Sequence, residues 1–290
     1  MKTIPLTVLA YEGPMLRAYL TMMRRSGFQP EAILLMVHTH NPATKKPLGR
    51  RLPGPMRKWY CERYQEVAFN LWPRRLSKSH PAMVDAIAGR LEEFVDQPGE
   101  LIREMVGRFR YDDYAARVDR VMVSGLRDPS LAEAIRTLDT KTVLFTGGGI
   151  VPPSLISSPG TNFIHVHPGH LPFVKGADGI LWSMLVRGQP GATCFIMNEG
   201  LDTGSLIVAQ DFPAPNIKIS GSDRPDDQTL YRATYSFYDP LLRAELLRQV
   251  LQFNTDILEL PTVAQDPSIG VTYNFMHDAL RRKALSRLFV

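Results

Sequence analysis

The chain has 290 residues, of which 44% are hydrophobic and 22% are charged, and it carries a formal net charge of +5. This length and composition suffice for a full α/β core, and they exclude an intrinsically disordered chain as the default interpretation. The modest positive charge can attract phosphates or nucleotides, but by itself it does not indicate nucleic-acid binding.

The two cysteines, Cys61 and Cys194, lie far apart and lack CxxC spacing. They therefore indicate neither a disulfide framework nor a thiolate metal site, and they favour a reducing compartment. No apolar run approaches the length of a membrane span, and the amino terminus lacks the cleavage pattern of a signal peptide. We therefore expect a cytoplasmic protein without a transmembrane segment.

The amino-terminal segment predicts a strand, a helix and a second strand. Residues 4–10 form an apolar run, Gly13 and Pro14 open a helix that continues to about residue 25, and residues 32–37 form a second apolar run. This order is the βαβ start of a doubly wound sheet. The turn at Gly13 does not follow the GxGxxG pattern, so the sequence does not support a dinucleotide cofactor there.

A basic segment interrupts this pattern over residues 41–78. Its positive residues are Lys45, Lys46, Arg50, Arg51, Arg57, Lys58, Arg63, Arg74, Arg75 and Lys78, and its acidic residues are Glu62 and Glu66. The interleaved aromatic residues fit a charged flap over an anionic ligand, a membrane-surface helix or an RNA contact. They also fit a solvated insertion whose aromatic side chains pack on the core. Because residues 80–117 show helical periodicity, we predict one helical insertion over about 40–117 rather than a second domain.

The sheet pattern resumes with an expected strand over 118–124, a helix over 129–138 capped by Asp128, and a strand over 142–145. Three glycines, Gly147, Gly148 and Gly149, follow directly at the carboxyl end of that strand. Glycine allows unusual backbone angles and the close approach of a flat ligand, so we predict a binding loop there.

The next strand, over residues 163–167, places His165 and His167 on one face, because residues two apart on a strand point the same way. Pro168 and Gly169 then turn the chain away, so both rings lie at the strand's carboxyl end. In open α/β sheets this end is where ligands bind.

The remaining elements complete the sheet and add helices. Asp178 is expected to cap a helix over about 179–187, and two strands over 192–197 and 206–210 flank a loop that presents Asp202 towards the histidines. Long helical patterns follow over residues 229–253, interrupted at Pro240, and at the carboxyl terminus. We therefore expect a catalytic domain over 1–221 and a mostly helical extension over 222–290.

The order GGGIVP, HxHPxxLP, a helix that begins with glycine, and GLDTG resembles the folate-dependent formyltransferase family. This family includes phosphoribosylglycinamide, methionyl-tRNA and amino-sugar formyltransferases. The resemblance implies a doubly wound, mainly parallel Rossmann-like sheet. It also implies transfer of a formyl group from 10-formyltetrahydrofolate to an amine, using an Asn, a His and an Asp. The family His corresponds to His167 and the family Asp to Asp202, whereas His165 stands where the family has Asn.

The resemblance also implies roles for these residues. His167 would stabilise the negative oxygen of a tetrahedral intermediate with the help of Asp202, and His165 would replace the second donor through one ring N–H. The residues expected to contact the folate are Gly147, Gly148, Gly149, Ile150 and Val151, and those expected to contact the acceptor are His170 and Lys175. The resemblance does not assign the basic insertion, for which a flap over an anionic acceptor or the glutamate tail of the folate stays one interpretation beside solvation and packing on the core.

Two other functions remain open at this stage. One is a metal-dependent hydrolase that uses His165, His167, His170 and Asp202, although HVHPGH lacks the central Asp of the HxHxDH metal motif. The other is a binding protein that kept the fold after losing the Asn. The acceptor is expected to be a small-molecule amine. An anionic or nucleotide-linked amine is one of the alternatives. Nucleic acid is disfavoured because no strand series resembling a carboxyl-terminal barrel follows, and a homo-oligomer is compatible with the sequence.

Overall fold

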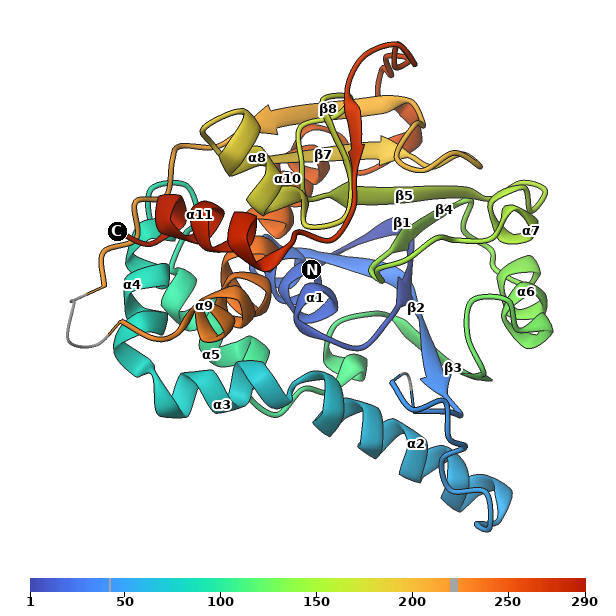
Figure 1. Ribbon diagram of the computed structural model, residues 1–290. Coiled ribbons are helices and arrows are strands. Elements are labelled where there is room, and N and C mark those ends of the chain that lie inside the picture. Colours follow the sequence, from blue (N-terminus) through green and yellow to red (C-terminus); the bar gives the residue numbers. More distant parts are fainter. Residues whose placement is uncertain (42, 220–223) are drawn as a thin grey trace.

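The computed structural model describes residues 1–41, 43–219 and 224–290 (Figure 1). Within those ranges, no helix combines the length and the apolar character needed to cross a bilayer.

A seven-stranded sheet in the order β3-β2-β1-β4-β5-β7-β8 forms the centre of the molecule. Its strands are β1 (Lys2–Ala10), β2 (Phe28–His38), β3 (Arg117–Val123), β4 (Thr142–Phe145), β5 (Asn162–His167), β7 (Gly191–Ile196) and β8 (Leu206–Asp211). The strands from β3 to β5 pair in parallel, whereas β7 is antiparallel to both of its neighbours. The predicted doubly wound, mainly parallel sheet is therefore confirmed, and its strand order reverses between β1 and β4.

Helices cover both faces of the sheet. Successive residues of one strand therefore pack into two different hydrophobic cores. In β1, Val8 packs into the larger hydrophobic cluster with α1 (Pro14–Arg25), whereas its neighbour Leu9 packs into a second cluster with α6 (Pro129–Arg136) and α7 (Pro153–Ile156). Figure 1 shows α6 and α7 on the side of the sheet away from α1.

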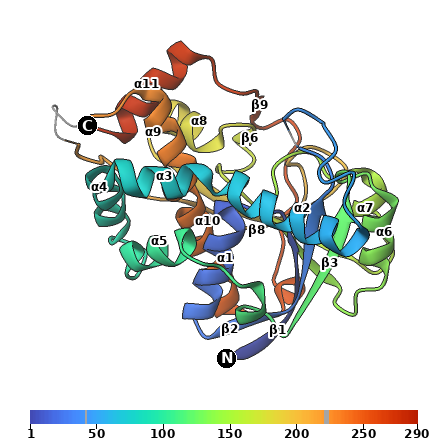
Figure 2. The same ribbon diagram turned by 90° about the horizontal axis from the view of Figure 1, so that it is seen from below.

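The predicted helical insertion is present and consists of four consecutive helices. They are α2 (Gly54–Phe69), α3 (Leu71–Ser79), α4 (Pro81–Leu91) and α5 (Pro98–Val106). Figure 2 shows α2 and α3 running one after the other across this side of the molecule, with α5 beneath them. The insertion begins after β2 and ends before β3, and α2 contacts β2.

The carboxyl-terminal segment shares the core with the sheet. It contains α9 (Asp227–Ala233), a π-helical turn (Thr234–Tyr238), α10 (Asp239–Phe253) and α11 (Asp278–Leu288). Helix α10 packs against α1, β5 and β7. The expected interruption at Pro240 takes the form of the π-helical turn just before α10, since proline lacks the N–H that a regular turn would use.

The expected cap at Asp178 is wrong. Asp178 precedes α8 (Gly179–Val186), but its side chain makes no cap hydrogen bond. Its carboxylate instead accepts hydrogen bonds from the hydroxyls of Tyr231 and Tyr235, and from the backbone N–H of Met276. Asp178 therefore joins α8 to the carboxyl-terminal segment. The same region contains a two-stranded sheet that the sequence did not predict, in which β6 (Val174–Gly176) pairs with β9 (Val271–Tyr273).

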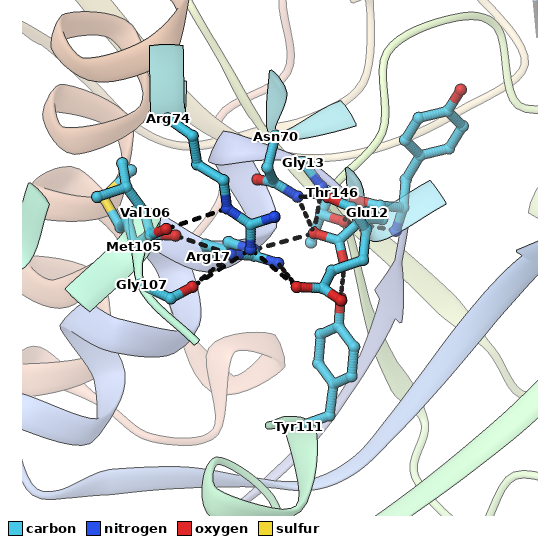
Figure 3. Close-up of polar contacts among 12 residues, drawn as sticks. Glu12, Gly13, Arg17, Asn70, Arg74, Met105, Val106, Gly107, Tyr111 and Thr146 are labelled. Carbon is cyan, nitrogen blue, oxygen red and sulfur yellow. Dashed lines mark hydrogen bonds and ion pairs between the residues drawn. The ribbon is translucent and has the colours of Figure 1, made fainter. Parts of the chain in front are cut away.

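A buried ion pair joins the turn after β1 to the helical insertion (Figure 3). Glu12 is 2% exposed and Arg17 is fully buried, and the Arg17 Nε lies 3.0 Å from the Glu12 Oε1. The same carboxylate accepts hydrogen bonds from the Asn70 amide and the Tyr111 hydroxyl, while Arg17 Nη1 donates to the carbonyl of Met105. Each of these three partners belongs to the insertion, so the network holds the insertion against the end of β1.

We predict that Glu12→Ala lowers the free energy of unfolding by about 3–5 kcal/mol, because the Arg17 guanidinium would stay buried without its counter-charge. Urea denaturation followed by circular dichroism measures this loss. Glu133→Ala is the control, since Glu133 forms an exposed pair with Arg136 on the surface of α6 and exposed pairs stabilise little. Similar losses in both variants would contradict the structural role given to Glu12.

Candidate active site

His167 and Asp202 meet at the carboxyl end of β5. His167 is 2% exposed, and its Nε2 lies 2.9 Å from the carbonyl oxygen of Val174. A carbonyl only accepts, so Nε2 carries the hydrogen and donates it. The other ring nitrogen, Nδ1, lies 3.5 Å from the Asp202 Oδ2. The structure therefore brings this predicted pair together.

The loop before β8 holds Asp202 in a strained backbone conformation. Asp202 has φ 54°, in the left-handed region that Asp tolerates better than most residues. Its Oδ2 also accepts a hydrogen bond of 2.8 Å from the backbone N–H of Gly176. Gly204 closes the loop, where a Cβ atom would lie only 1.7 Å from the carbonyl oxygen of Ile196. The GLDTG sequence thus fixes the carboxylate next to His167.

Gly169 makes room for the His167 ring. A Cβ atom at residue 169 would lie 2.8 Å from the Val174 carbonyl oxygen and 3.0 Å from the His167 Nε2. A larger residue would therefore collide with both partners of the hydrogen bond that fixes His167.

His165 has a hydrogen-bonding partner at each ring nitrogen, which differs from the expected role. Its Nδ1 lies 3.0 Å from the carbonyl oxygen of Phe145, and its Nε2 lies 3.4 Å from Nη2 of Arg243. The carbonyl requires a donor at Nδ1 and the guanidinium requires an acceptor at Nε2, so the ring is neutral with its hydrogen on Nδ1. In this arrangement His165 has no free N–H for the oxygen of an intermediate.

Both imidazoles are held neutral. Burial and the nearby Arg243 guanidinium lower the pKa of His165 to about 3. Burial also lowers the pKa of His167, and the Asp202 carboxylate only partly opposes this effect. A neutral His167 that donates from Nε2 has a lone pair on Nδ1, facing a carboxylate. The pair therefore presents two hydrogen-bond acceptors that face each other.

Arg243 is the site residue that sequence reasoning missed. It lies on α10, its side chain is 8% exposed, and it pairs with Asp239 one turn earlier at 3.4 Å. A signal was present, because DPLLRAELL places an Asp and an Arg four residues apart, one helical turn, among several leucines. The sequence alone does not show which strand this helix covers.

The glycine loop is anchored at both ends and exposed in the middle. Gly147 packs beneath the Phe145 ring, where a Cβ atom would lie 2.6 Å from it, and Val151 is 2% exposed in the second core cluster. Between them Gly148 and Gly149 are exposed, and Ile150 is 70% exposed. The loop therefore presents backbone groups and one apolar side chain beside β5.

The two residues expected to contact an acceptor bind to the protein itself. His170 Nδ1 lies 2.9 Å from the Asp211 carboxylate, and the Lys175 ammonium is buried and donates to the carbonyl of Ile269 at 3.2 Å. The binding of an acceptor by His170 and Lys175 stays a prediction, and these contacts within the protein do not favour it.

The histidines do not converge on a common point. In the described part of the chain, no group of three or more His, Cys, Asp or Glu side chains is arranged to hold a metal ion. The ligand set that the metal-dependent hydrolase requires is thus not formed by His165, His167, His170 and Asp202.

The lowered pKa of His165 predicts acid sensitivity. The unfolded chain protonates this imidazole near pH 6.5 but the folded chain only near pH 3, so stability is lost as the pH falls below 6.5. Between pH 7.5 and pH 5 this loss amounts to about 2 kcal/mol for one such group. Urea unfolding at the two pH values should show a smaller loss for His165→Gln than for the wild type. His277→Gln, at an exposed position, should behave like the wild type, and an unchanged pH dependence in His165→Gln would refute the buried neutral state.

Gly169→Ala is expected to destabilise the fold by about 1–3 kcal/mol, the usual cost of overpacking. Gly148→Ala is the matched control, because a Cβ atom there meets no atom within 4 Å. Equal unfolding midpoints for Gly169→Ala and the wild type would show that the turn can relax around His167.

The part of the chain that carries this site is similar to known proteins. Residues 109–220 match the family model described as formyl transferase. A methionyl-tRNA formyltransferase from Syntrophus aciditrophicus (strain SB) is 33% identical over 94 residues, which are 31% of this chain and 30% of that protein. One from Lachnospira eligens is 31% identical over 105 residues, 35% of this chain and 33% of that protein. The chain thus matches about a third of the length of these relatives.

Among solved structures, a sugar N-formyltransferase from Shewanella sp FDAARGOS_354 aligns over 98% of this chain and 87% of its own, with a TM-score of 0.48 and 11% identity. The matched segment 109–220 contains β4, β5, the glycine loop, His165, His167 and Asp202. The segment that carries the candidate site is therefore similar to the formyltransferase family.

Proposed function

We propose that the protein transfers a formyl group from 10-formyltetrahydrofolate to the amine of a small metabolite in the cytoplasm. The observation that carries this proposal is the His167–Asp202 pair beside an exposed glycine loop, within the segment that matches the family. Both cysteines are buried and unpaired, which fits a reducing compartment.

The reaction needs a proton acceptor for the amine. As the amine nitrogen attacks the formyl carbon, it forms a new C–N bond and loses a proton, and the bond from the formyl carbon to the folate nitrogen then breaks. The His167 Nδ1 lone pair and the Asp202 carboxylate, 3.5 Å apart, take up the proton of the amine together. The same pair then returns a proton to the leaving folate nitrogen, so protons balance over the cycle.

The negative oxygen of the intermediate needs hydrogen-bond donors. Since both nitrogens of His165 already have partners, we assign this role to backbone N–H groups of the exposed loop at Gly148 and Gly149 instead. Backbone donors do not depend on a tautomer, and glycine leaves them open to a ligand.

A small acceptor fits the described fold better than a transfer RNA does. After β8, the described residues form helices and the three-residue strand β9 rather than a barrel. Several cations of the basic insertion are also engaged within the protein. Arg63 and Arg74 pair with Glu66, and Arg57 donates to the carbonyl of Leu48. We therefore assign the insertion chiefly to packing over the site.

Asp202→Asn and His167→Ala are each predicted to lower kcat at least about 100-fold, because each removes one half of the proton acceptor. Release of tetrahydrofolate from 10-formyltetrahydrofolate, followed spectroscopically with a panel of amines, measures the effect. Since the two residues share one proton, the double variant should be no slower than the slower single variant. His277→Gln is the control on the exposed surface. Wild-type kcat in either single variant would exclude this mechanism.

A further inference from the structure

The buried guanidinium of Arg243 lies beside both candidate imidazoles. It is 3.4 Å from the Nε2 of His165, and its positive charge lowers the pKa of His165 and of His167. No other residue described at the site both donates to His165 and carries a positive charge.

We propose that Arg243 is a positioning residue that locks His165 in one neutral tautomer, with the hydrogen on Nδ1 and the lone pair on Nε2. The guanidinium can only donate, so it excludes a hydrogen on Nε2. The Phe145 carbonyl can only accept, so it selects a hydrogen on Nδ1. Together, these two partners allow only the neutral tautomer with its hydrogen on Nδ1.

The cost of burying Arg243 supports a role beyond stability. Its side chain is 8% exposed and that of Asp239 is 4% exposed, at a separation of 3.4 Å. Within the described part of the chain, the Arg243 Nε and the Asp239 Oδ1 have no hydrogen-bond partner. A buried ion pair with imperfect partners stabilises no more than apolar residues of similar volume would, and the neighbouring buried residues of α10 are mostly leucine. A specific effect on His165 explains why a charge occupies this position.

The contacts of His165 with Arg243 and Phe145 also connect three elements of the site. Arg243 comes from α10, His165 from β5, and Phe145 is the last residue of β4. Phe145 immediately precedes Thr146 and the glycine loop, so the His165 bond to its carbonyl fixes where that loop begins. Arg243 therefore positions the loop relative to His167 through His165.

The charged and titratable groups around His165 are few. Arg243 faces it from α10 and His167 shares its strand, while Asp239 and Tyr19 of α1 contribute to the charge around Arg243 itself. Removing the guanidinium would leave the ring with the Phe145 carbonyl as its one remaining hydrogen-bonding partner. The pKa of His165 should then rise, because one of the causes that lower it is gone, but burial is the larger cause and still holds it below its ordinary value.

Nitrogen-15 NMR of the histidine side chains tests the tautomer directly, with the His165 signals assigned from their loss in His165→Gln. In the wild type we expect hydrogen on Nδ1, a bare Nε2, and no titration between pH 8 and pH 5. In Arg243→Met, the Nε2 of His165 loses this donor, so a fraction of the rings should carry the hydrogen on Nε2 instead. Arg243→Lys, which keeps the positive charge and a donor, should restore the wild-type signals. Arg248→Met removes an arginine of α10 that pairs with Glu245, and it should change nothing at His165.

A hydrogen on Nε2 in the wild type, or titration of the wild-type ring near pH 6.5, would overturn the inference. The wild-type spectrum decides this even if Arg243→Met fails to fold, and Arg243→Gln then serves as the milder replacement. Unchanged His165 signals in folded Arg243→Met or Arg243→Gln would also overturn it.

The catalytic consequence rests on the proposed function. Arg243→Met should lower kcat about 10-fold to 100-fold, the range typical when the partner that orients an imidazole is lost, with a smaller effect on KM. If no amine is formylated by the wild type, the proposed function fails while the NMR result still decides the role of Arg243. If kcat falls without a change of tautomer, the proposed function stands and the positioning role is wrong.

Discussion

His167 donates its Nε2 hydrogen to the Val174 carbonyl, 2.9 Å away, and the chemistry of the site depends on this bond. It fixes the tautomer, so the lone pair on Nδ1 must face Asp202. It also requires glycine at residue 169, since a Cβ atom there would lie against both partners. The strained backbone of Asp202 is tolerated because it brings the carboxylate to that lone pair. One backbone carbonyl thus determines which residues the neighbouring turns can contain.

Two buried ion pairs hold helices against the carboxyl edge of the sheet. Glu12 and Arg17 fasten the insertion to the end of β1, and Asp239 and Arg243 bring a charge of α10 to the end of β5. Helix α1 carries Arg17 and packs directly on α10, so the two pairs lie on neighbouring helices. Buried charges tolerate little displacement, because water cannot replace a lost partner. The edge that holds the site is therefore built more rigidly than apolar packing alone would make it.

The parts of this fold that follow local rules were predictable from the sequence. The strand ending in His165 and His167, the glycine loop and the helical insertion each follow from periodicity or turn residues within one segment. The contacts that give His165 and Asp178 their roles were not predictable, because their partners lie far along the chain. Arg243 is 78 residues from His165, and Met276 is 98 residues from Asp178. The local sequence pattern predicted that Asp178 caps a helix, but its carboxylate instead accepts hydrogen bonds from two distant tyrosine hydroxyls.

The histidine in place of the family asparagine places a requirement on the rest of the site. An asparagine amide donates and accepts hydrogen bonds in one fixed form at any ordinary pH, whereas an imidazole has two neutral tautomers and a charged form. At residue 165 a free choice among these forms would let the hydrogen leave the Phe145 carbonyl and release the start of the glycine loop. A donor that is always charged removes the choice, and arginine is the side chain that stays charged when buried. In the proposed arrangement, His165 and Arg243 act as one unit in the place of a single amide. In this arrangement both nitrogens of the ring have partners, which is why the proposed mechanism assigns stabilisation of the reacting oxygen to the backbone of the loop.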